Sequence, residues 1–401
     1  MRKKISIFIN SVSSGGAERV VSLLLNYLKN DFDIYLVLLN NNIDYDLPEA
    51  QKIFCLNQSA NENGLLKLIK LPILAIRYKR FCKKNNIETS LSFLKRANYI
   101  NCLSRLYGLR CTIIISERTY LSNYLKFIGK TGRLTGKILT KKLYPKADLI
   151  IPNSSLIQTD LEKNFNIHTK FTVINNPVNL KVIQRLSAEN VDTFLFETFT
   201  FISVGGFRAE KNYGLLIDAF DKIRDLNCKL VLMGKGEDEI KLKKKVRQMD
   251  LESMIHFLKF DTNPYKYLSK ADCFVLSSDF EGFPNSIQEA LACSLPVIST
   301  DCQSGPREIL APGTDVHSVL KNDIEIAKYG LLVPVNNAER LSQAMRLIYT
   351  NSHLRNTLHT NAYERAKDFD ITRIVDQFKK ILLSNQNSTS DAKNNNIESS
   401  F

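Results

Sequence analysis

Metal-binding and redox motifs are scarce in this sequence of 401 residues. Its eight cysteines form no C-x-x-C pair, and none is spaced with a histidine as in a zinc site. The five histidines do not cluster either. Several cysteines sit inside apolar runs, where a free thiol behaves as a small hydrophobic side chain. The sequence therefore predicts no bound metal, no other cofactor and a reducing, cytosolic environment.

A run long enough to cross a membrane is also missing. The apolar segment GLLKLIKLPILAI is interrupted by Lys67, Lys70 and Pro72, and it is shorter than the ~20 residues that a spanning helix needs. The first residues, MRKKISIFINSVSSGG, resemble a signal peptide, but their apolar run is too short. A strand that enters a glycine-rich turn explains them better. We expect a chain that does not cross a membrane.

Acidic residues are scarce in the first half only. Residues 1–190 hold 29 Lys and Arg against 13 Asp and Glu, whereas residues 191–401 hold 26 against 28. No acid occurs in residues 64–84 or 118–146, where Lys and Arg alternate with apolar residues. This pattern predicts helices that lie on an anionic membrane surface, where each cation contributes ~1 kcal/mol. The alternative is a solvated basic face over ordinary core helices.

Short β-branched runs alternate with helical patterns along the whole chain, which is typical of parallel sheets built from βαβ units. Strands are expected near residues 4, 34, 89, 111 and 148. A polar stretch from about 181 to 192 follows, and then a second series begins: TFISVG, KLVLMG, MIHFLK, DCFVLS, PVISTD and GLLVPV. Ligands of such open sheets bind at the carboxyl ends of the strands.

The restart of this pattern predicts an α/β fold with two Rossmann-like parallel-sheet domains that face each other across a cleft. The first domain is expected at residues 1–185 and the second at 186–370. Residues 371–384 are expected to form a helix that packs back on the first domain. The polar residues 385–401 are expected to be a disordered tail.

Glycines stand at two junctions between a strand and a helix. Gly15 and Gly16 follow the first strand, where backbone amides can approach an anion at the start of a helix. A plain tight turn explains this pair equally well. Gly234 follows the strand KLVLM, but the acids after it suit a helix N-terminus. That junction is therefore interpreted as a structural turn in the wall of the cleft.

A third junction, SVGGFRAEKNYG, adds two cations to its glycines. Gly205 and Gly206 precede Arg208 and Lys211, just before an amphipathic helix. Arg offers a bidentate fork and Lys a point charge, so the pair could hold a diphosphate. The G-K-[ST] ending of nucleotide hydrolases is absent. Two solvated surface cations are the alternative.

The stretch DFEGFPNSIQEALACSLPVIST contains two glutamates, Glu281 and Glu289, eight positions apart. Gly282 and Pro284 prevent a continuous helix through the first glutamate, so a helix is expected to begin at one of the two residues after the proline. Ser286 and Glu289 match a capping box, worth roughly 1 kcal/mol. A capping box does not explain Glu281.

Taken in this order, the motifs resemble those of family 4 of the glycosyltransferases, which are retaining, metal-independent enzymes of GT-B architecture. EGFPNSIQE reproduces the family's E-x7-E signature, and EALACSLPVISTD matches the segment around it. VGGFRAEKN is similar to the diphosphate-binding turn, GGAERV to the N-terminal glycine loop and YGLLVPVNN to the strand before the closing helices. The resemblance spans roughly residues 5 to 380.

The resemblance implies a role for each matching position. Glu289 would bind the ribose hydroxyls of a nucleotide-sugar, and Glu281 would lie near the donor sugar. Arg208 and Lys211 would neutralise the leaving diphosphate, so that neither a metal nor a covalent nucleophile is needed. The remaining donor-binding positions come from the glycine turns and the E-x7-E segment: Gly15, Gly16, Gly205, Gly206, Gly234, Gly282, Phe283, Asn285 and Ser286.

Two positions depart from the family's pattern. The family often has Arg directly after the glycine of the diphosphate turn, where this chain has Gly206, so Arg208 is expected to reach the phosphates instead. The family often places a His after a first-domain strand, where this chain reads IIISERTY. Glu117 or Arg118 is expected to contact the donor or acceptor there, with Glu117 as the catalytic candidate.

The resemblance implies transfer of a hexose or N-acetylhexosamine from a UDP-sugar to a lipid-linked saccharide, in the assembly of an O-antigen, capsule or exopolysaccharide. The protein would then work in the cytoplasm at the inner face of the cell membrane. A nucleotide-sugar epimerase of GT-B shape is the alternative. Nucleic-acid binding is supported by charge alone, because few aromatic residues are interleaved with the cations, and no nucleic-acid partner is expected.

Overall fold

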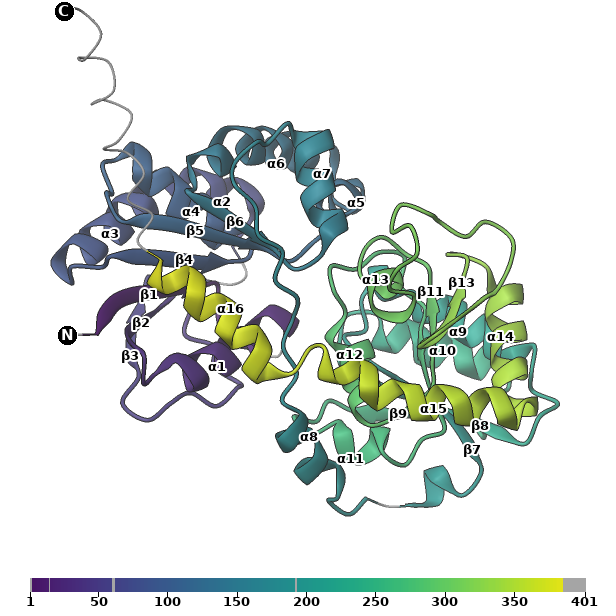
Figure 1. Ribbon diagram of the computed structural model, residues 1–401. Helices are drawn as coiled ribbons and strands as arrows, with labels where there is room; N and C mark the ends of the chain where they lie inside the picture. Colours follow the sequence, from purple (N-terminus) through teal and green to yellow (C-terminus); the bar gives the residue numbers. More distant parts are fainter. Residues whose placement is uncertain (1, 14, 60–61, 192, 385–401) are drawn as a thin grey trace, which may run out of the picture.

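Two α/β domains make up the structure, which is a computed structural model (Figure 1). It describes residues 2–13, 15–59, 62–191 and 193–384. The tail expected at 385–401 lies outside the described residues. Each domain has a central sheet with helices on both faces, which confirms the predicted pair of parallel-sheet domains.

The first sheet has six strands, all parallel, in the order β3-β2-β1-β4-β5-β6. The sequence did not predict β3, because this strand has four residues, is partly exposed and lies at the sheet edge. The strands are β1 (Lys3–Ile9), β2 (Phe32–Leu38), β3 (Lys52–Cys55), β4 (Thr89–Phe93), β5 (Thr112–Glu117) and β6 (Leu149–Pro152).

Side chains of β1 alternate between two cores, as expected of a strand with helices on both faces. Ile5, Ile7 and Ile9 pack in the core under α1 and α16 (Ile371–Leu383), whereas Phe8 packs in the core under α3 to α7. The helices of this domain are α1 (Gly16–Leu28), α2 (Gly64–Ile69), α3 (Leu71–Lys84), α4 (Lys95–Leu106), α5 (Leu121–Phe127), α6 (Lys130–Leu143) and α7 (Ser155–Phe165).

The second sheet has seven strands in the order β12-β13-β11-β10-β7-β8-β9. All neighbours are parallel except β12 and β13, and the short edge strand β12 was not predicted either. The strands are β7 (Phe199–Val204), β8 (Cys228–Gly234), β9 (Ile255–Lys259), β10 (Cys273–Leu276), β11 (Val297–Thr300), β12 (Glu325–Ala327) and β13 (Gly330–Val333).

Helices also cover both faces of the second sheet. One core contains α9, α10 and α14, and the other contains α8, α11, α12 and α13. The helices are α8 (Leu180–Ser187), α9 (Tyr213–Asp221), α10 (Glu239–Gln248), α11 (Tyr265–Leu268), α12 (Asn285–Ala292), α13 (Pro306–Leu310), α14 (Ala338–Thr350), α15 (Ser352–Lys367) and α16 (Ile371–Leu383).

The chain crosses between the domains twice, and the two crossings are hydrogen-bonded to each other. The amide of Val178 donates to the carbonyl of Phe369 at 2.9 Å, and the amide of Ile371 donates to the carbonyl of Val178 at 2.8 Å. Leu180 and Ile183 of α8 already pack in the second domain. By packing, the first domain therefore ends before residue 185.

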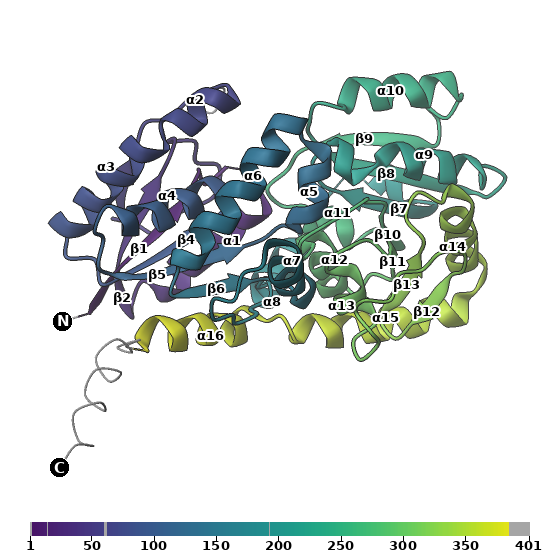
Figure 2. The same cartoon turned by 90° about the horizontal axis from the view of Figure 1, so that it is seen from above.

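After the second crossing, α16 lies along the first domain (Figure 1, Figure 2). Its buried side chains share a core with α1 and with the strands of the first sheet. The C-terminal helix thus ties the end of the chain to the domain in which the chain begins.

Replacing Phe378 of α16 by Ala should destabilise the first domain. The ring is fully buried, 6.5 Å from that of Phe93, so we expect a loss of about 3–5 kcal/mol in the free energy of unfolding. Urea denaturation measures it. Leu383→Ala, at a position 50% exposed at the end of the same helix, should change little. Equal effects of the two substitutions would contradict this packing.

Candidate functional site

A cleft of about 1500 Å³ separates the two domains. It is lined by the segments that follow β1, β4, β5 and β6 in the first sheet and β7, β8 and β10 in the second. In the second sheet β7 and β10 are neighbours, but the connection from β7 runs to β8 on one side and the connection from β10 runs to β11 on the other. Such a switch point leaves a crevice at the carboxyl ends of the strands, where ligands of open α/β sheets bind.

The glycine turns after β7 and β8 pack against each other. A Cβ atom on Gly234 would lie 1.9 Å from the carbonyl oxygen of Gly205, and one on Gly236 would lie 2.2 Å from that of Phe207. Both positions therefore exclude a side chain for packing reasons. Gly205 and Gly206 also line the cleft. The structural interpretation of the turn at Gly234 agrees with this geometry.

Lys211 and Glu281 were proposed separately, and the structure brings them into contact. Lys211 Nζ donates to Glu281 Oε1 at 2.6 Å, and the Ser278 hydroxyl donates to the same oxygen at 2.6 Å. The two charged side chains are 16% and 10% exposed. The turn after β7 and the loop after β10 thus share a half-buried ion pair inside the cleft.

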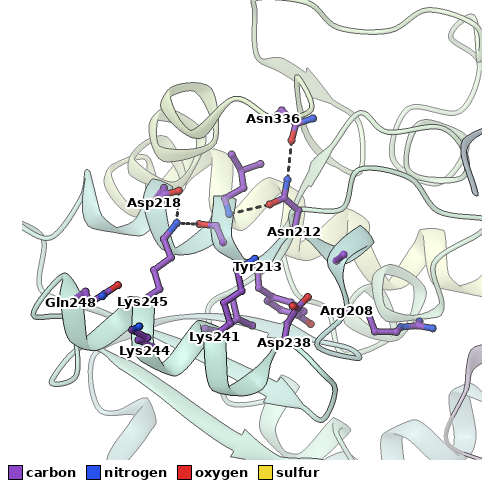
Figure 3. A pocket seen from close by; sticks show the side chains of 14 residues that line it. Arg208, Asn212, Tyr213, Asp218, Asp238, Lys241, Lys244, Lys245, Gln248 and Asn336 are labelled. Carbon is purple, nitrogen blue, oxygen red and sulfur yellow. Dashed lines mark hydrogen bonds and ion pairs between the residues drawn. The ribbon is translucent and has the colours of Figure 1, made fainter. Parts of the chain in front are cut away.

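Asn212 fixes the turn that carries Lys211. Its side-chain oxygen accepts from the amide of Leu215 and caps α9. Its amide nitrogen donates to Asp279 at 2.8 Å and to Asn336 at 2.9 Å, and the second of these bonds is drawn in Figure 3. The turn is therefore held to the β10 loop on one side and to the loop before α14 on the other.

Arg208 is less constrained than Lys211. Its side chain is 58% exposed and pairs with Glu210 at 3.1 Å. It borders both the cleft and a second hollow of about 690 Å³ between α9 and α10, and in Figure 3 it extends away from the other labelled side chains of that hollow. Arg208 therefore lines the cleft as a largely exposed cation beside the glycine turn after β7.

The helix of the E-x7-E segment begins at Asn285, as predicted, but the capping box is wrong. Pro284 is the N-cap of α12, and no side chain caps this helix. The Glu289 carboxylate instead pairs with Arg19 of α1, with Nη1 3.2 Å from Oε1. Burial raises the pKa of Glu289, and the charge of Arg19 opposes that shift. Glu289 lines the cleft.

Gly282 lies directly against the backbone of the first domain. A Cβ atom on this residue would lie 1.9 Å from the carbonyl oxygen of Arg118 and 2.8 Å from its carbonyl carbon. Backbone atoms on both sides cannot move away as a flexible side chain can. The glycine in the E-x7-E segment is therefore required by the contact between domains.

Hydrogen bonds from the same segment continue this contact. Asn176 Nδ2 donates to the carbonyl of Phe283 at 2.7 Å and to Asn285 Oδ1 at 2.6 Å. Asn285 Nδ2 in turn donates to the carbonyl of Gly16 at 3.1 Å. Ser286 lies beside them in the cleft wall. The predicted glycine loop and the E-x7-E helix thus meet directly.

Glu117, predicted as a catalytic candidate, lies behind the cleft wall. It is 1% exposed, and its carboxylate accepts from the Tyr144 hydroxyl at 2.5 Å and from the amides of Arg118 and Thr119 at 3.0 and 3.1 Å. Burial raises its pKa. Arg118 and Thr119 line the cleft, whereas Glu117 does not. Glu117 therefore holds the loop that places Arg118 in the cleft wall.

The analysis of the sequence did not single out Arg19 and Lys95, which line the cleft, or Tyr265, which is buried beside Arg19. Arg19 stands three residues after the glycine pair, in GGAERV, where a cation one turn into a helix was a usable signal. Lys95 opens α4 and lies over the ring of Tyr124, and burial lowers the pKa of its ammonium group to about 8. Tyr265 belongs to no sequence motif that would have indicated a site residue.

The segment Asp44-Tyr45-Asp46 has the spacing of an Asp-x-Asp motif. Tyr45 lines the cleft, and its ring centroid is 5.9 Å from the guanidinium carbon of Arg19. Within the described ranges, no group of three or more His, Cys, Asp or Glu side chains is placed to hold a metal ion.

Comparison with known proteins identifies the family. Residues 187–365 match the family described as "Glycosyl transferases group 1". Over 386 residues, 95% of this chain and 100% of the relative, the sequence is 38% identical to the N-acetylgalactosamine-N,N'-diacetylbacillosaminyl-diphospho-undecaprenol 4-alpha-N-acetylgalactosaminyltransferase of Campylobacter jejuni. The chain belongs to this family of glycosyltransferases.

Other relatives of this glycosyltransferase agree. A lipopolysaccharide 1,6-galactosyltransferase of Escherichia coli is 29% identical, with 61% of this chain and 71% of the relative covered. The fold matches sucrose-phosphate synthase from Thermosynechococcus elongatus with a TM-score of 0.79, at 17% identity over 95% and 98% of the two chains. It matches Anabaena HepE in complex with UDP and glucose with a TM-score of 0.74, at 18% identity over 96% and 100%. These matches confirm the GT-B fold.

Gly282→Ala should force the two domains of this glycosyltransferase apart, because the new methyl group would overlap the Arg118 carbonyl. Small-angle X-ray scattering should then give a larger radius of gyration than for the unsubstituted protein. Gly129→Ala is the control, because a Cβ atom there meets no heavy atom within 4 Å. An unchanged radius for Gly282→Ala would show that the domains do not depend on this contact.

Proposed function

We propose that this protein is a retaining, metal-independent glycosyltransferase that moves a hexose or N-acetylhexosamine from a UDP-sugar to a lipid-linked saccharide in surface-polysaccharide assembly. The single observation that carries the proposal is the cleft itself, where the Lys211–Glu281 pair, Glu289 and two glycine turns meet between two Rossmann-like domains. The name of the Campylobacter jejuni relative includes an undecaprenol-diphosphate acceptor, which supports the lipid-linked class.

The diphosphate of the donor would bind at the turn after β7. Lys211 has three N–H donors and uses one on Glu281, so two can serve phosphate oxygens. Arg208 would add a bidentate fork from the more exposed side. Charge that develops on the leaving diphosphate would be stabilised by these two fixed cations, which is the largest single contribution in many enzymes.

Glu281 would orient the donor sugar. Lys211 and Ser278 both donate to its Oε1, so Oε2 can accept from a sugar hydroxyl. Arg118 and Lys95 lie in the wall that belongs to the first domain, where an acceptor saccharide would enter. In this arrangement Glu281 is held rigidly by neighbours on two loops, as positioning of a reacting sugar requires.

The exposed face of α2 and α6 would contact the lipid of the acceptor. Leu65 and Ile69 on α2 are 69% and 61% exposed, and Leu134 on α6 is 62% exposed. Both helices lie on the same side of the first domain (Figure 2). Exposed cations accompany them on α6: Arg133, Lys137, Lys141 and Lys142.

Apolar side chains between cations suit the surface of an anionic bilayer. Among the described helices, none is long and apolar enough to span a membrane. We therefore propose peripheral binding to the inner face of the cell membrane through α2 and α6, as the basic first half of the sequence predicts.

Lys211→Ala and Glu281→Ala should each lower kcat/KM for sugar transfer by about two to three orders of magnitude, because both act on the reacting groups. The assay follows transfer from a panel of UDP- and GDP-sugars to an undecaprenyl-diphosphate-linked saccharide. The donor is chosen beforehand by thermal shift, since a bound nucleotide-sugar raises the melting temperature.

Lys241→Ala is the matched control, because Lys241 borders the hollow behind the turn and not the cleft. Normal turnover in both cleft variants would overturn the proposal. Appearance of a new nucleotide-sugar when the donor is incubated without acceptor would instead indicate an epimerase.

Leu134→Asp should weaken binding to vesicles that contain anionic lipid by tenfold or more, because burial of a leucine contributes about 1.5–3 kcal/mol. Co-sedimentation with such vesicles measures it. Ile240→Asp, at a position 83% exposed on α10 of the second domain, is the control and should bind as before. Equal binding of all three proteins would exclude α6 from the membrane contact.

A further inference from the structure

Arg19 reaches from the first domain to a glutamate of the second. It stands on the first turn of α1, and its Nη1 lies 3.2 Å from Glu289 Oε1 on α12. The guanidinium also donates to the Tyr265 hydroxyl of α11. The Arg19 side chain is 22% exposed and that of Glu289 is 8% exposed, so water screens this pair poorly.

Two tyrosines fix the position of Arg19. Its guanidinium carbon lies 5.1 Å from the ring centroid of Tyr265 and 5.9 Å from that of Tyr45. One tyrosine belongs to each domain, so the guanidinium is flanked by a ring from both sides of the cleft. Contacts of this kind contribute ~0.5–2 kcal/mol each as cation–π interactions.

Among the groups that face Glu289, Arg19 supplies the opposite charge. Burial raises the pKa of the neighbouring Tyr265, Tyr45 and Cys293, so these groups stay neutral at physiological pH. Burial also raises the pKa of Glu289, and Arg19 is the charge that lowers it. Glu18 and Asp44, the acids nearest in sequence to Arg19 and Tyr45, act on Tyr45.

We propose that Arg19 is a positioning residue that holds the Glu289 carboxylate ionised and oriented toward the cleft, so that it can accept hydrogen bonds from the vicinal hydroxyls of a nucleotide ribose. This inference rests on the proposed function, in which the donor is a nucleotide-sugar. Arg19 acts through Glu289 and across the domain boundary. Binding of the nucleotide is therefore coupled to contact between the two domains.

The two oxygens of the Glu289 carboxylate have different partners in this proposal. Glu289 Oε1 forms the ion pair with Arg19, which leaves Oε2 for a ribose hydroxyl. A protonated carboxyl group would lose acceptor capacity at one of its oxygens. Without Arg19, burial alone would keep the pKa of Glu289 high, and protonation would begin at a higher pH. Nucleotide affinity would then fall as the pH decreases and recover as the pH rises.

Calorimetric titration with UDP between about pH 6 and pH 9 tests this prediction. Each variant is compared with the unsubstituted protein at the same pH, because Lys95, with a pKa of about 8, and the terminal phosphate of UDP titrate in every case. The affinity of Arg19→Gln relative to the unsubstituted protein should fall several-fold at the acid end and recover at the alkaline end, because burial then raises the pKa of Glu289 unopposed. Arg19→Lys keeps the charge and should restore the profile of the unsubstituted protein.

Two further proteins separate this role from a purely structural one. Glu289→Gln should bind UDP more weakly at every pH, because a neutral amide is a weaker acceptor than a carboxylate. Since this amide cannot titrate, adding Arg19→Gln to it should cause no further pH dependence. Arg247→Gln removes the arginine of an exposed Arg–Glu pair on α10, at 3.1 Å from Glu252, and should match the unsubstituted protein throughout.

The ribose can be tested directly with 2′-deoxy-UDP. The unsubstituted protein should prefer UDP, and Arg19→Gln at the acid end should lose most of that preference. A UDP affinity and pH profile of Arg19→Gln equal to those of the unsubstituted protein would overturn the inference and leave the proposed function intact. If Arg19→Gln does not fold, the inference is overturned by a pH-dependent loss of Arg19→Lys relative to the unsubstituted protein, or by a ratio of Glu289→Gln affinity to unsubstituted affinity that changes with pH. A chain that binds neither UDP nor GDP would overturn the proposed function itself.

Discussion

The two domains of this protein meet on a segment that has no room for a side chain. Gly282 approaches the carbonyl of Arg118 so closely that a methyl group would overlap it. Around this point Asn176, Asn285 and Gly16 form hydrogen bonds across the boundary. The segment that would hold the donor sugar is therefore also the segment that joins the domains, and a change in one function affects the other.

Inside the cleft, two ion pairs each keep a carboxylate oxygen or an N–H group that is not used within the pair. Lys211 with Glu281, and Arg19 with Glu289, are both shielded from water. Such pairs add little net stability, because desolvation offsets most of their attraction. Their value is positional: each holds a charged group at a defined place and leaves hydrogen-bonding capacity for a ligand. A nucleotide-sugar could bind to these groups with little further ordering of side chains.

The uneven charge of the chain follows the division into domains. The first domain carries the basic excess and exposes apolar side chains on α2 and α6. The second domain is near neutral and contains the glycine turns after β7 and β8. A lipid-linked acceptor and a soluble donor require this kind of asymmetry, because one substrate lies in a membrane and the other arrives from solution. The cleft between the domains is where the two would meet.

Local rules in the sequence determined most of the architecture. Hydrophobic periodicity gave the longer strands and α16, and Gly282 with Pro284 gave the start of α12. The edge strands β3 and β12 were missed, because three or four half-exposed residues carry little periodic signal. Glu281, Glu289, Arg208 and Lys211 were found from their spacing, since each belongs to a short motif beside a strand end.

Only the tertiary structure decided which of these groups touch. Arg19 and Glu289 are 270 positions apart, and no pattern within a helix turn can pair them. The capping box failed because α12 begins one residue before Ser286, so this serine is not the N-cap, and the Glu289 carboxylate pairs with Arg19 instead. Glu117 stands at the expected junction, but Tyr144 and two amides take its oxygens and leave Arg118 in the cleft wall. The sequence determines which chemical groups each loop carries. The contact between two separately folded domains determines which of these groups face the ligand.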